Sequence, residues 1–345
     1  MNSIWVFAAI IIFYWFMTMY VTPYFAMMSE LGHTPDERLF LSTLISITWA
    51  VGTAIGTQSY ALKGVFEGWG LTPTAAFQTV IALFAGIGFL FMLLPILFID
   101  EKKYCKSEPN HLKISESLKQ AFKNKNFRIF TLSDLAYWVS ETFVVSGLVY
   151  YVTILLGTEE AFTSTLQIVM FIVSFIFYLP TTFIAKRMGK KRLMIIAFFV
   201  LILVFSLIMF LGKIPLSATI QGYLLIILMG IPLAIFGILP NSIIGDIAEA
   251  DALVTGQNKT AIFYGARTFM SKIGQMIAGL LFPSLLLLGS TRGNDIGVRL
   301  TGLAAVIFVI IGLICFLYYD ENEVLEILKG PTSKPNTSDP QKDGD

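Results

Sequence analysis

Residues 193–211 read LMIIAFFVLILVFSLIMFL, a run of 19 residues with no charge and one polar side chain, Ser206. A helix that crosses a bilayer needs about 20 mostly apolar residues, because the hydrocarbon core is roughly 30 Å thick and each helical residue rises about 1.5 Å. The preceding residues 186–192 read KRMGKKR and carry five cations. The stretch therefore predicts a membrane-spanning helix that begins beside a basic connection.

Eight further stretches meet the same requirement of length and polarity. Backbone polar groups cannot stay unpaired in lipid, so each stretch must be a helix, and no alternation of period two suggests a barrel. The sequence predicts an all-α integral membrane protein, a helix bundle of about nine transmembrane helices. The predicted spans are 4–28, 39–62, 73–99, 127–156, 161–185, 193–211, 220–244, 262–288 and 298–319.

The composition of the whole chain supports this class. Of its 345 residues, 56% are hydrophobic and 14% are charged, and the mean hydropathy is +0.75. A soluble domain carries about 45–50% apolar and roughly 25% charged residues. The net charge of +1 gives no indication of a nucleic-acid partner. The partner that the composition predicts is the lipid bilayer.

Residue types that commonly bind metals or act in catalysis are sparse in this sequence. The two cysteines, Cys105 and Cys315, and the two histidines, His33 and His111, have no metal-ligand spacing. Paired histidines, a nucleophile elbow and a phosphate loop are all missing from the sequence. We therefore expect no enzyme and no cofactor, apart from a coupling cation (Na⁺ or H⁺) if the protein is a symporter.

Basic residues fall almost entirely on one side of the predicted spans. That side receives 18 of the 24 Lys and Arg residues, and the other side receives four. The remaining two, Arg267 and Lys272, lie within a span. Basic connections stay in the cytoplasm, so the sequence predicts a multi-pass protein of the plasma membrane with its C-terminus in the cytoplasm.

The spacing of the spans predicts four segments. Residues 1–99 hold three spans, residues 100–126 form a long cytoplasmic loop, and residues 127–319 hold six spans. Residues 320–345 form a cytoplasmic tail. Its last part is rich in Pro, Ser, Lys and Asp, so we expect the tail to be largely disordered.

Four ionisable residues fall at membrane depth, where an unpaired charge is costly and marks a candidate functional site. Asp134 and Glu141 share one face of the fourth span, and Arg267 and Lys272 lie in the eighth. Lys272 and Glu141 lie near the midplane, where they are expected to bind substrate, an ion or each other. A structural ion pair is the alternative. Arg267 and Asp134 are shallower, and anchoring at the headgroups is a further alternative for them.

Small residues and prolines predict local features of two spans. Gly230, Pro232, Gly237 and Pro240 are expected to interrupt the seventh span, as in transporters with broken helices. The pair Gly52 and Gly56 forms a GxxxG motif, which favours close contact between helices.

Several stretches resemble the glycoside–pentoside–hexuronide:cation symporters, the branch of the major facilitator superfamily that includes the melibiose carrier. The strongest are GDIAEAD at 245–251 and IFYGARTFMSKIGQ at 262–275, which are similar to the family's acidic loop and the span that follows it. Lys272 falls on the family's intramembrane lysine, and Arg267 and Tyr264 belong to the same pattern. The resemblance implies that Asp246, Glu249 and Asp251 form a cytoplasmic gating motif.

Other stretches extend the resemblance over most of the chain. Residues 22–38, from TPY to DER, resemble a helix end and loop that place Arg38 in the gating motif, and Thr18 matches a threonine that lines the family's site. The family has twelve spans in two halves, so the resemblance implies the last three helices of the first half and a complete second half. The first three helices would be missing, from a truncated product or a longer chain. Val21 and Ile45 stand where the family has an aspartate and an arginine.

The resemblance implies a secondary transporter, a cation-coupled symporter of sugars or glycosides. Its substrate would be a small molecule bound between two helix bundles. Two alternatives stay open from the sequence: a carrier of lysolipids or other amphiphiles, and a truncated membrane protein that does not transport.

Overall fold

The computed structural model describes residues 2–57, 59–99, 119, 121–159 and 161–329. In this part of the chain nine helices are long and apolar enough to span a membrane, and no strand is formed. The all-helical membrane fold and the number of spans are therefore confirmed. The helices are α1 (Asn2–Leu31), α2 (Pro35–Thr57), α3 (Ser59–Gly68), α4 (Pro73–Phe98), α7 (Lys125–Tyr150), α8 (Ala161–Met188), α9 (Lys190–Phe210), α10 (Ala218–Thr255), α11 (Thr260–Leu286), α12 (Ile296–Leu317) and α13 (Glu321–Lys329), with a π-helical turn at Tyr151–Leu155 after α7.

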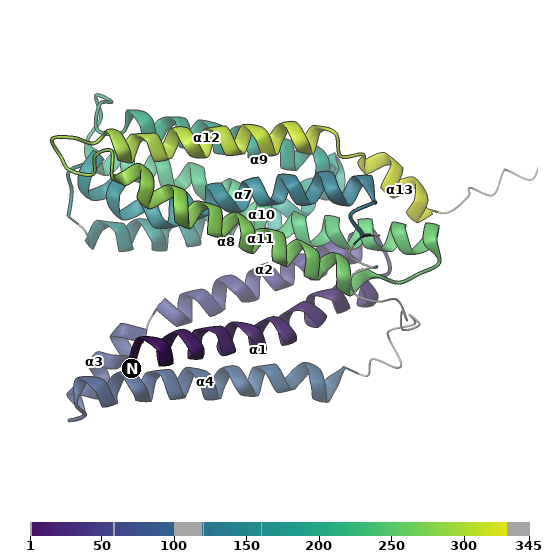
Figure 1. Cartoon of the computed structure of the whole chain (residues 1–345), viewed down its shortest axis with the longest axis horizontal. Coiled ribbons are helices and arrows are strands. Elements are labelled where there is room, and N and C mark those ends of the chain that lie inside the picture. Colours follow the sequence, from purple (N-terminus) through teal and green to yellow (C-terminus); the bar gives the residue numbers. More distant parts are fainter. Residues whose placement is uncertain (1, 58, 100–118, 120, 160, 330–345) are drawn as a thin grey trace, which may run out of the picture.

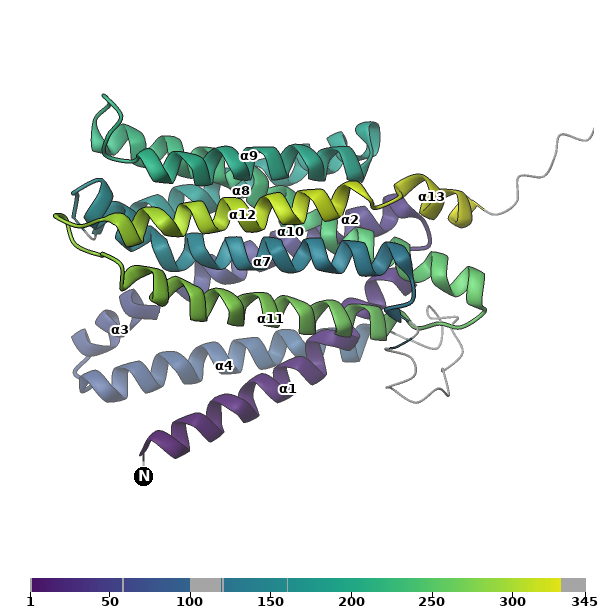
Figure 2. The same ribbon diagram turned by 45° about the horizontal axis from the view of Figure 1, so that its top comes forward.

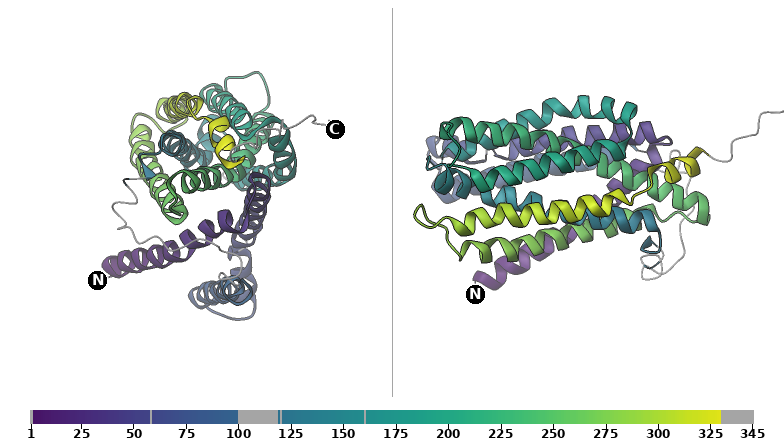
Figure 3. Two further views of the ribbon diagram at one scale, coloured as in Figure 1. Left: turned by 90° about the vertical axis from the view of Figure 1, so that its right-hand side faces the viewer. Right: turned by 90° about the horizontal axis from the view of Figure 1, so that it is seen from above.

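Helices α7 to α12 form one bundle, and α1 to α4 lie on one side of it (Figure 1). The six helices of the bundle run roughly along a common axis (Figure 2). Helix α2 packs on α8 and α10, and α1 packs on α11 and α10. Helix α4 packs mainly on α3 and lies away from the bundle in the end-on view (Figure 3). Two helices, α1 and α2, therefore connect the two parts.

The segment boundaries expected from the sequence stay predictions. Residues 100–118 of the long loop and residues 330–345 of the tail, including the stretch expected to be disordered, lie outside the described residues. The start of the tail forms α13.

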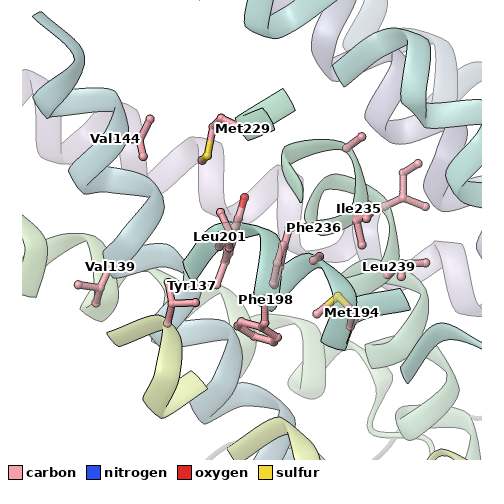
Figure 4. Close-up of a cluster of buried hydrophobic side chains, with 14 of the residues drawn as sticks. Tyr137, Val139, Val144, Met194, Phe198, Leu201, Met229, Ile235, Phe236 and Leu239 are labelled. Carbon is pink, nitrogen blue, oxygen red and sulfur yellow. The ribbon is translucent and has the colours of Figure 1, made fainter. Parts of the chain in front are cut away.

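Aromatic rings of three helices pack together in the core of the bundle. The rings of Tyr137 on α7 and Phe236 on α10 are stacked, with centroids 3.9 Å apart, and Phe198 on α9 meets Phe236 edge to face at 4.9 Å (Figure 4). Aromatic pairs of these geometries stabilise a core beyond their buried area. The contacts fix three helices of the bundle relative to one another.

Large apolar side chains cover the outer surfaces of α1 and α4. Phe89, Leu90 and Phe91 on α4 are each more than 60% exposed, and Trp5 and Phe7 on α1 are similarly exposed. A soluble protein rarely exposes a continuous apolar surface of this size. Lipid is the environment that such a surface requires.

Glycine allows α11 to approach α7 closely. A Cβ atom added at Gly274 would lie 2.8 Å from the carbonyl oxygen of Leu135 and 3.2 Å from Cβ of Trp138. Small residues at a helix interface let two backbones pack tightly in a membrane. The GxxxG motif of Gly52 and Gly56 plays no such part in the described structure, because no atom lies within 4 Å of an added Cβ at either position. Both glycines lie on a surface of α2 that faces away from the other described helices.

The seventh span is one continuous helix, so the predicted interruption is wrong. Helix α10 runs through Pro232 and Pro240. The carbonyl oxygens of Gly237 and Ile238, just before Pro240, accept hydrogen bonds from the hydroxyls of Ser46 and Ser42 on α2. Helix α2 therefore contacts the backbone of α10 directly beside this proline.

The predicted acidic loop at 245–251 is also helical. Asp246, Glu249 and Asp251 lie in the last turns of α10, which ends at Gly256. Gly256 has φ 68° and donates its N–H to the carbonyl of Ala252 at 2.8 Å. Glycine adopts this left-handed conformation without strain. The helix therefore stops at the first glycine after the acidic residues, not before them.

We predict that Gly274→Ala destabilises the protein, because the added methyl group forces α11 away from Leu135. Overpacking of this kind costs about 1–3 kcal/mol. The matched control is Gly279→Ala on the same helix, where an added Cβ meets no atom within 4 Å. Thermal unfolding in detergent should show a lower Tm for the first variant and an unchanged or higher Tm for the control. Equal Tm values for both variants would contradict this packing.

Candidate functional site

An ion pair connects α7 and α11 at membrane depth. Arg267 donates through Nε and Nη2 to the two carboxylate oxygens of Asp134, at 3.0 and 3.2 Å. The Asp134 side chain is 1% exposed and that of Arg267 is 14% exposed. A guanidinium and a carboxylate that face each other with two parallel hydrogen bonds form a strong, directional pair. The predicted charges at these positions therefore neutralise each other rather than reach the headgroups.

Neighbouring side chains satisfy the rest of this pair. Nη1 of Arg267 donates to Oδ1 of Asn241 on α10 at 2.6 Å, and Nε1 of Trp138 donates to Asp134 at 3.2 Å. The hydroxyl of Tyr264 donates to the carbonyl of Asn241 at 2.8 Å, so this predicted site residue has a structural partner. Three helices meet at the pair. A buried ion pair with its remaining hydrogen bonds satisfied is tolerated in a low dielectric.

Lys272 and Glu141, in contrast, form no such pair. Nζ of Lys272 donates to Oε1 of Gln275 at 3.1 Å and lies 5.9 Å from the ring centre of Tyr14 on α1. Within the described residues no carboxylate lies within 4.0 Å of this ammonium. Glu141 on α7 is half-buried and has no hydrogen-bond or ion-pair partner in the same part of the chain. A base and an acid on adjacent helices therefore lie within electrostatic range of each other without forming an ion pair within 4.0 Å.

Thr18 lies on the same face of α1 as Tyr14 and Thr22, because residues four apart in a helix share a face. Cγ2 of Thr22 would lie 3.4 Å from a Cβ atom at Gly265 on α11, so this face is the one that meets α11. The hydroxyl of Thr18 donates to the carbonyl of Tyr14 at 2.8 Å. Thr18, Tyr14 and Lys272 therefore lie on the side where α1 meets α11, and all three residues are exposed in the described structure.

A second group of charges lies where α2 meets the bundle. Nε of Arg38 donates to Oδ1 of Asp246 at 2.8 Å, and the ammonium of Lys190 contacts the other carboxylate oxygen of Asp246. We call these three residues the Arg38–Asp246–Lys190 cluster. They come from α2, α10 and α9, and all three are buried. One carboxylate thus joins a cation of α2 to a cation of the bundle.

Backbone and hydroxyl oxygens complete the surroundings of this cluster. Lys190 also donates to Oγ of Ser242 at 2.7 Å and to the carbonyl of Pro35 at 3.4 Å. Arg38 donates through Nη1 to the carbonyl of Gly32 at 2.9 Å, whereas its Nη2 has no partner among the described atoms. The cluster therefore carries an excess positive charge and one unsatisfied buried donor.

The other two acidic residues of the predicted gating motif do not join this cluster. Asp251 pairs with Lys259 at 2.7 Å and accepts from Nδ2 of Asn124 at 3.0 Å, which ties the end of α10 to α11 and α7. Glu249 is half-buried and makes no hydrogen bond or ion pair in the described part of the molecule. Asp246 is the member of the motif that contacts α2.

The sequence interpretation missed Lys190, Asn241 and Ser242. Lys190 was counted only as one of the cations of a basic connection, yet it starts α9 and points into the bundle. Ser242 and Asp246 are four residues apart, and that spacing places both on one face of a helix. Recognising that α10 continues past residue 244 through the acidic residues would have made this shared polar face visible.

The fold and these buried charges define a helical membrane transporter. Residues 1–319 match the sequence profile of the family described as MFS/sugar transport protein. The chain therefore belongs to this family of sugar transporters, whose members are not enzymes. The finer resemblance to the melibiose-carrier branch stays a prediction.

Two known proteins show how far the similarity extends. The chain is 25% identical over 328 residues to the inner membrane symporter YicJ of Escherichia coli (strain K12), which covers 92% of this chain and 68% of that protein. It also superposes on the major facilitator superfamily transporter FucP in its outward conformation, with a TM-score of 0.60 and 15% identity over 85% of this chain and 71% of FucP. The second likeness concerns the fold alone. Neither favours a lysolipid carrier.

We predict that breaking the Asp134–Arg267 pair from either side is more harmful than removing both charges. Asp134→Asn or Arg267→Gln leaves one buried charge unpaired, which costs about 3–5 kcal/mol. The double variant leaves none and should recover most of the loss in Tm. Thermal unfolding of the three variants in detergent tests this coupling, and additive losses in the double variant would refute it.

Proposed function

We propose that the chain is a cation-coupled symporter of sugars or glycosides that works by alternating access. The observation that carries this proposal is Lys272, an ammonium within α11 that faces α1 with no carboxylate within 4.0 Å among the described residues. A charge at membrane depth almost always faces a hydrated cavity or a transport pathway. Membership of a sugar-transport family makes a sugar the substrate class for that pathway.

The side chains near Lys272 suit a neutral molecule with many hydroxyl groups. Lys272 offers donors, Gln275 offers a donor and an acceptor, and Glu141 offers carboxylate acceptors. Trp138 is half-buried one turn before Glu141 and offers an aromatic surface. Binding sites for small molecules combine aromatic surfaces with a few polar groups that fix orientation. Arg267 and Asp134 would support the site, because their own charges are already paired.

Glu141 is the residue that we propose for coupling to a cation. Val21 stands where the related symporters carry an acidic residue on the first span, so α1 offers no carboxylate at that position. Glu141 is a half-buried acid at membrane depth that makes no hydrogen bond or ion pair within 4.0 Å among the described residues, although the charge of Lys272 acts on it. An ionised carboxylate there is costly, and uptake of a proton or a sodium ion removes that cost. Cation binding at Glu141 would then favour the loaded carrier.

Alternating access requires α1, α2 and α4 to move relative to the six-helix bundle. We assign these three helices to the first half of the transporter and α7 to α12 to the second. The 18 cations on one side of the spans favour a cytoplasmic location for the Arg38–Asp246–Lys190 cluster and for the C-terminus. The cluster then acts as the cytoplasmic gate, because separating Asp246 from Arg38 opens the contact between α2 and the bundle.

We predict gradient-driven uptake of a sugar into proteoliposomes. The panel contains labelled glycosides, pentoses, hexuronates and one lysolipid, each tested with a sodium gradient, a proton gradient or neither. Lys272→Ala should reduce uptake at least tenfold, because the site loses the ammonium that donates to Gln275 and faces Tyr14. Glu141→Gln should abolish the dependence on the gradient but keep exchange of sugar across the membrane.

Matched controls come from charged residues of the connections. Lys213→Ala and Glu159→Gln remove the same groups from exposed positions outside the spans and should leave uptake unchanged. Movement of the lysolipid without any sugar would contradict the proposed substrate class. Uptake that keeps its full gradient dependence in Glu141→Gln would contradict the proposed coupling residue.

A further inference from the structure

The helix after the last span is docked against the cytoplasmic end of the bundle. Asn126 on α7 accepts from the backbone N–H of Asp320 at 3.0 Å and donates to Oε2 of Glu323 at 2.9 Å. Val324 of α13 is 3% exposed. Asp320 also accepts from the backbone N–H of Glu323 at 3.1 Å, as the residue that caps a helix does. Helix α13 is therefore a defined part of the structure.

Glu321 of α13 caps another helix, α9. Its carboxylate oxygens accept from the backbone N–H groups of Lys190 at 2.7 Å and Lys191 at 3.2 Å. The residue in the capping position of α9 is Gly189, which has no side chain to do this and adopts φ 91°. The first N–H groups of a helix need acceptors, and a negative charge is favourable there. Glu321 supplies both from a distant part of the chain.

The same Lys190 reaches the proposed gate with its side chain. Its backbone is held by Glu321, and its ammonium contacts Asp246, Ser242 and the carbonyl of Pro35 on α2. A shift of the first turn of α9 would therefore move the ammonium that Asp246 shares with Arg38. A continuous series of polar contacts runs from α13 through α9 and α10 to α2.

The packing of α13 on the bundle leaves a pocket that is open to the surface. Its volume is about 170 Å³, and it lies between α13, α7 and α10, lined by Asn124, Ile247, Asp251, Val254, Val324 and Ile327. The polar contacts of Asn126 and Glu321, rather than tight apolar packing alone, hold the helix in place. Such docking suits a contact that forms and breaks.

We propose that Glu321 is a positioning residue of the transport cycle: by capping α9 it holds Lys190 against Asp246 and so keeps the cytoplasmic contact between α2 and the bundle closed. The inference rests on the proposed function, because it assigns the Arg38–Asp246–Lys190 cluster to the gate. Release of α13 then weakens the gate without any change at Lys272 or Glu141.

The test measures opening of the gate without substrate. Thr43 on α2 is 1% exposed and faces Thr182 on α8, so a cysteine there reacts only when the contact opens. The rate at which Thr43→Cys reacts with an impermeant maleimide, in full-length protein with Cys105→Ser and Cys315→Ser, reports the open population. Glu321→Gln should raise this rate roughly threefold to tenfold, the factor expected from losing one charged cap.

Three further variants decide between positioning and a general effect on the fold. Glu326→Gln makes the same change at an exposed position of α13 without a described partner and should leave the rate unchanged. Glu321→Asp keeps the charge and should give an intermediate rate. In an Asp246→Asn background, Glu321→Gln should add nothing further. An unchanged rate in Glu321→Gln, or the same increase in both backgrounds, would overturn the proposal.

These outcomes do not depend on sugar transport. If the unmodified protein moves no sugar, the proposed function fails while the labelling rates still measure how Glu321 acts on the contact between α2 and the bundle. If sugar uptake is normal and Glu321→Gln leaves the rate unchanged, the inference about Glu321 alone fails.

Discussion

The carboxylate of Asp246, shared between Arg38 of α2 and Lys190 of α9, is the contact on which the relation of the two parts of the molecule depends. Other polar contacts between α2 and the bundle lie further along α2. Ser42 and Ser46 bind carbonyl oxygens of α10, and the hydroxyl of Thr43 lies 2.5 Å from that of Thr182 on α8. Because α4 packs mainly on α3, these contacts and those of α1 hold the two parts together.

The ion pairs of Asp246 suit a contact that the protein must also be able to break. Buried ion pairs add little net stability, because desolvation of the charges offsets much of their attraction. Nη2 of Arg38 is buried without a described partner, which costs about 1–3 kcal/mol in the closed arrangement. The Asp134–Arg267 pair differs, since all of its nitrogen atoms have partners and both residues lie within the bundle. The proposed gate requires the first group of charges to separate, whereas the Asp134–Arg267 pair joins α7 to α11.

The sequence predicted the features that depend on the length of an apolar stretch. It did not predict the features that depend on contacts between residues far apart in the sequence. The spans followed from stretches such as 193–211, because lipid leaves the backbone no alternative to a helix. The hydroxyl contacts of α2 with α10 just before Pro240 could not be predicted, since α2 is far away in the sequence. Asp134 and Arg267 were recognised as buried charges, but their pairing depends on how α7 and α11 pack. Lys190 could not be told apart by sequence from the other cations of its basic connection, of which Lys186 also pairs with an acid of α2, Asp36.

The most direct test of the account is a reversible cross-link between α2 and the bundle. Cysteines at Thr43 and Thr182, whose hydroxyls are 2.5 Å apart, replace the two native cysteines as the only thiols of the chain. We predict that oxidation joins them, that uptake of the transported sugar then stops, and that a reducing agent restores it. Full uptake by the cross-linked protein would contradict the claim that α2 must leave the bundle during transport.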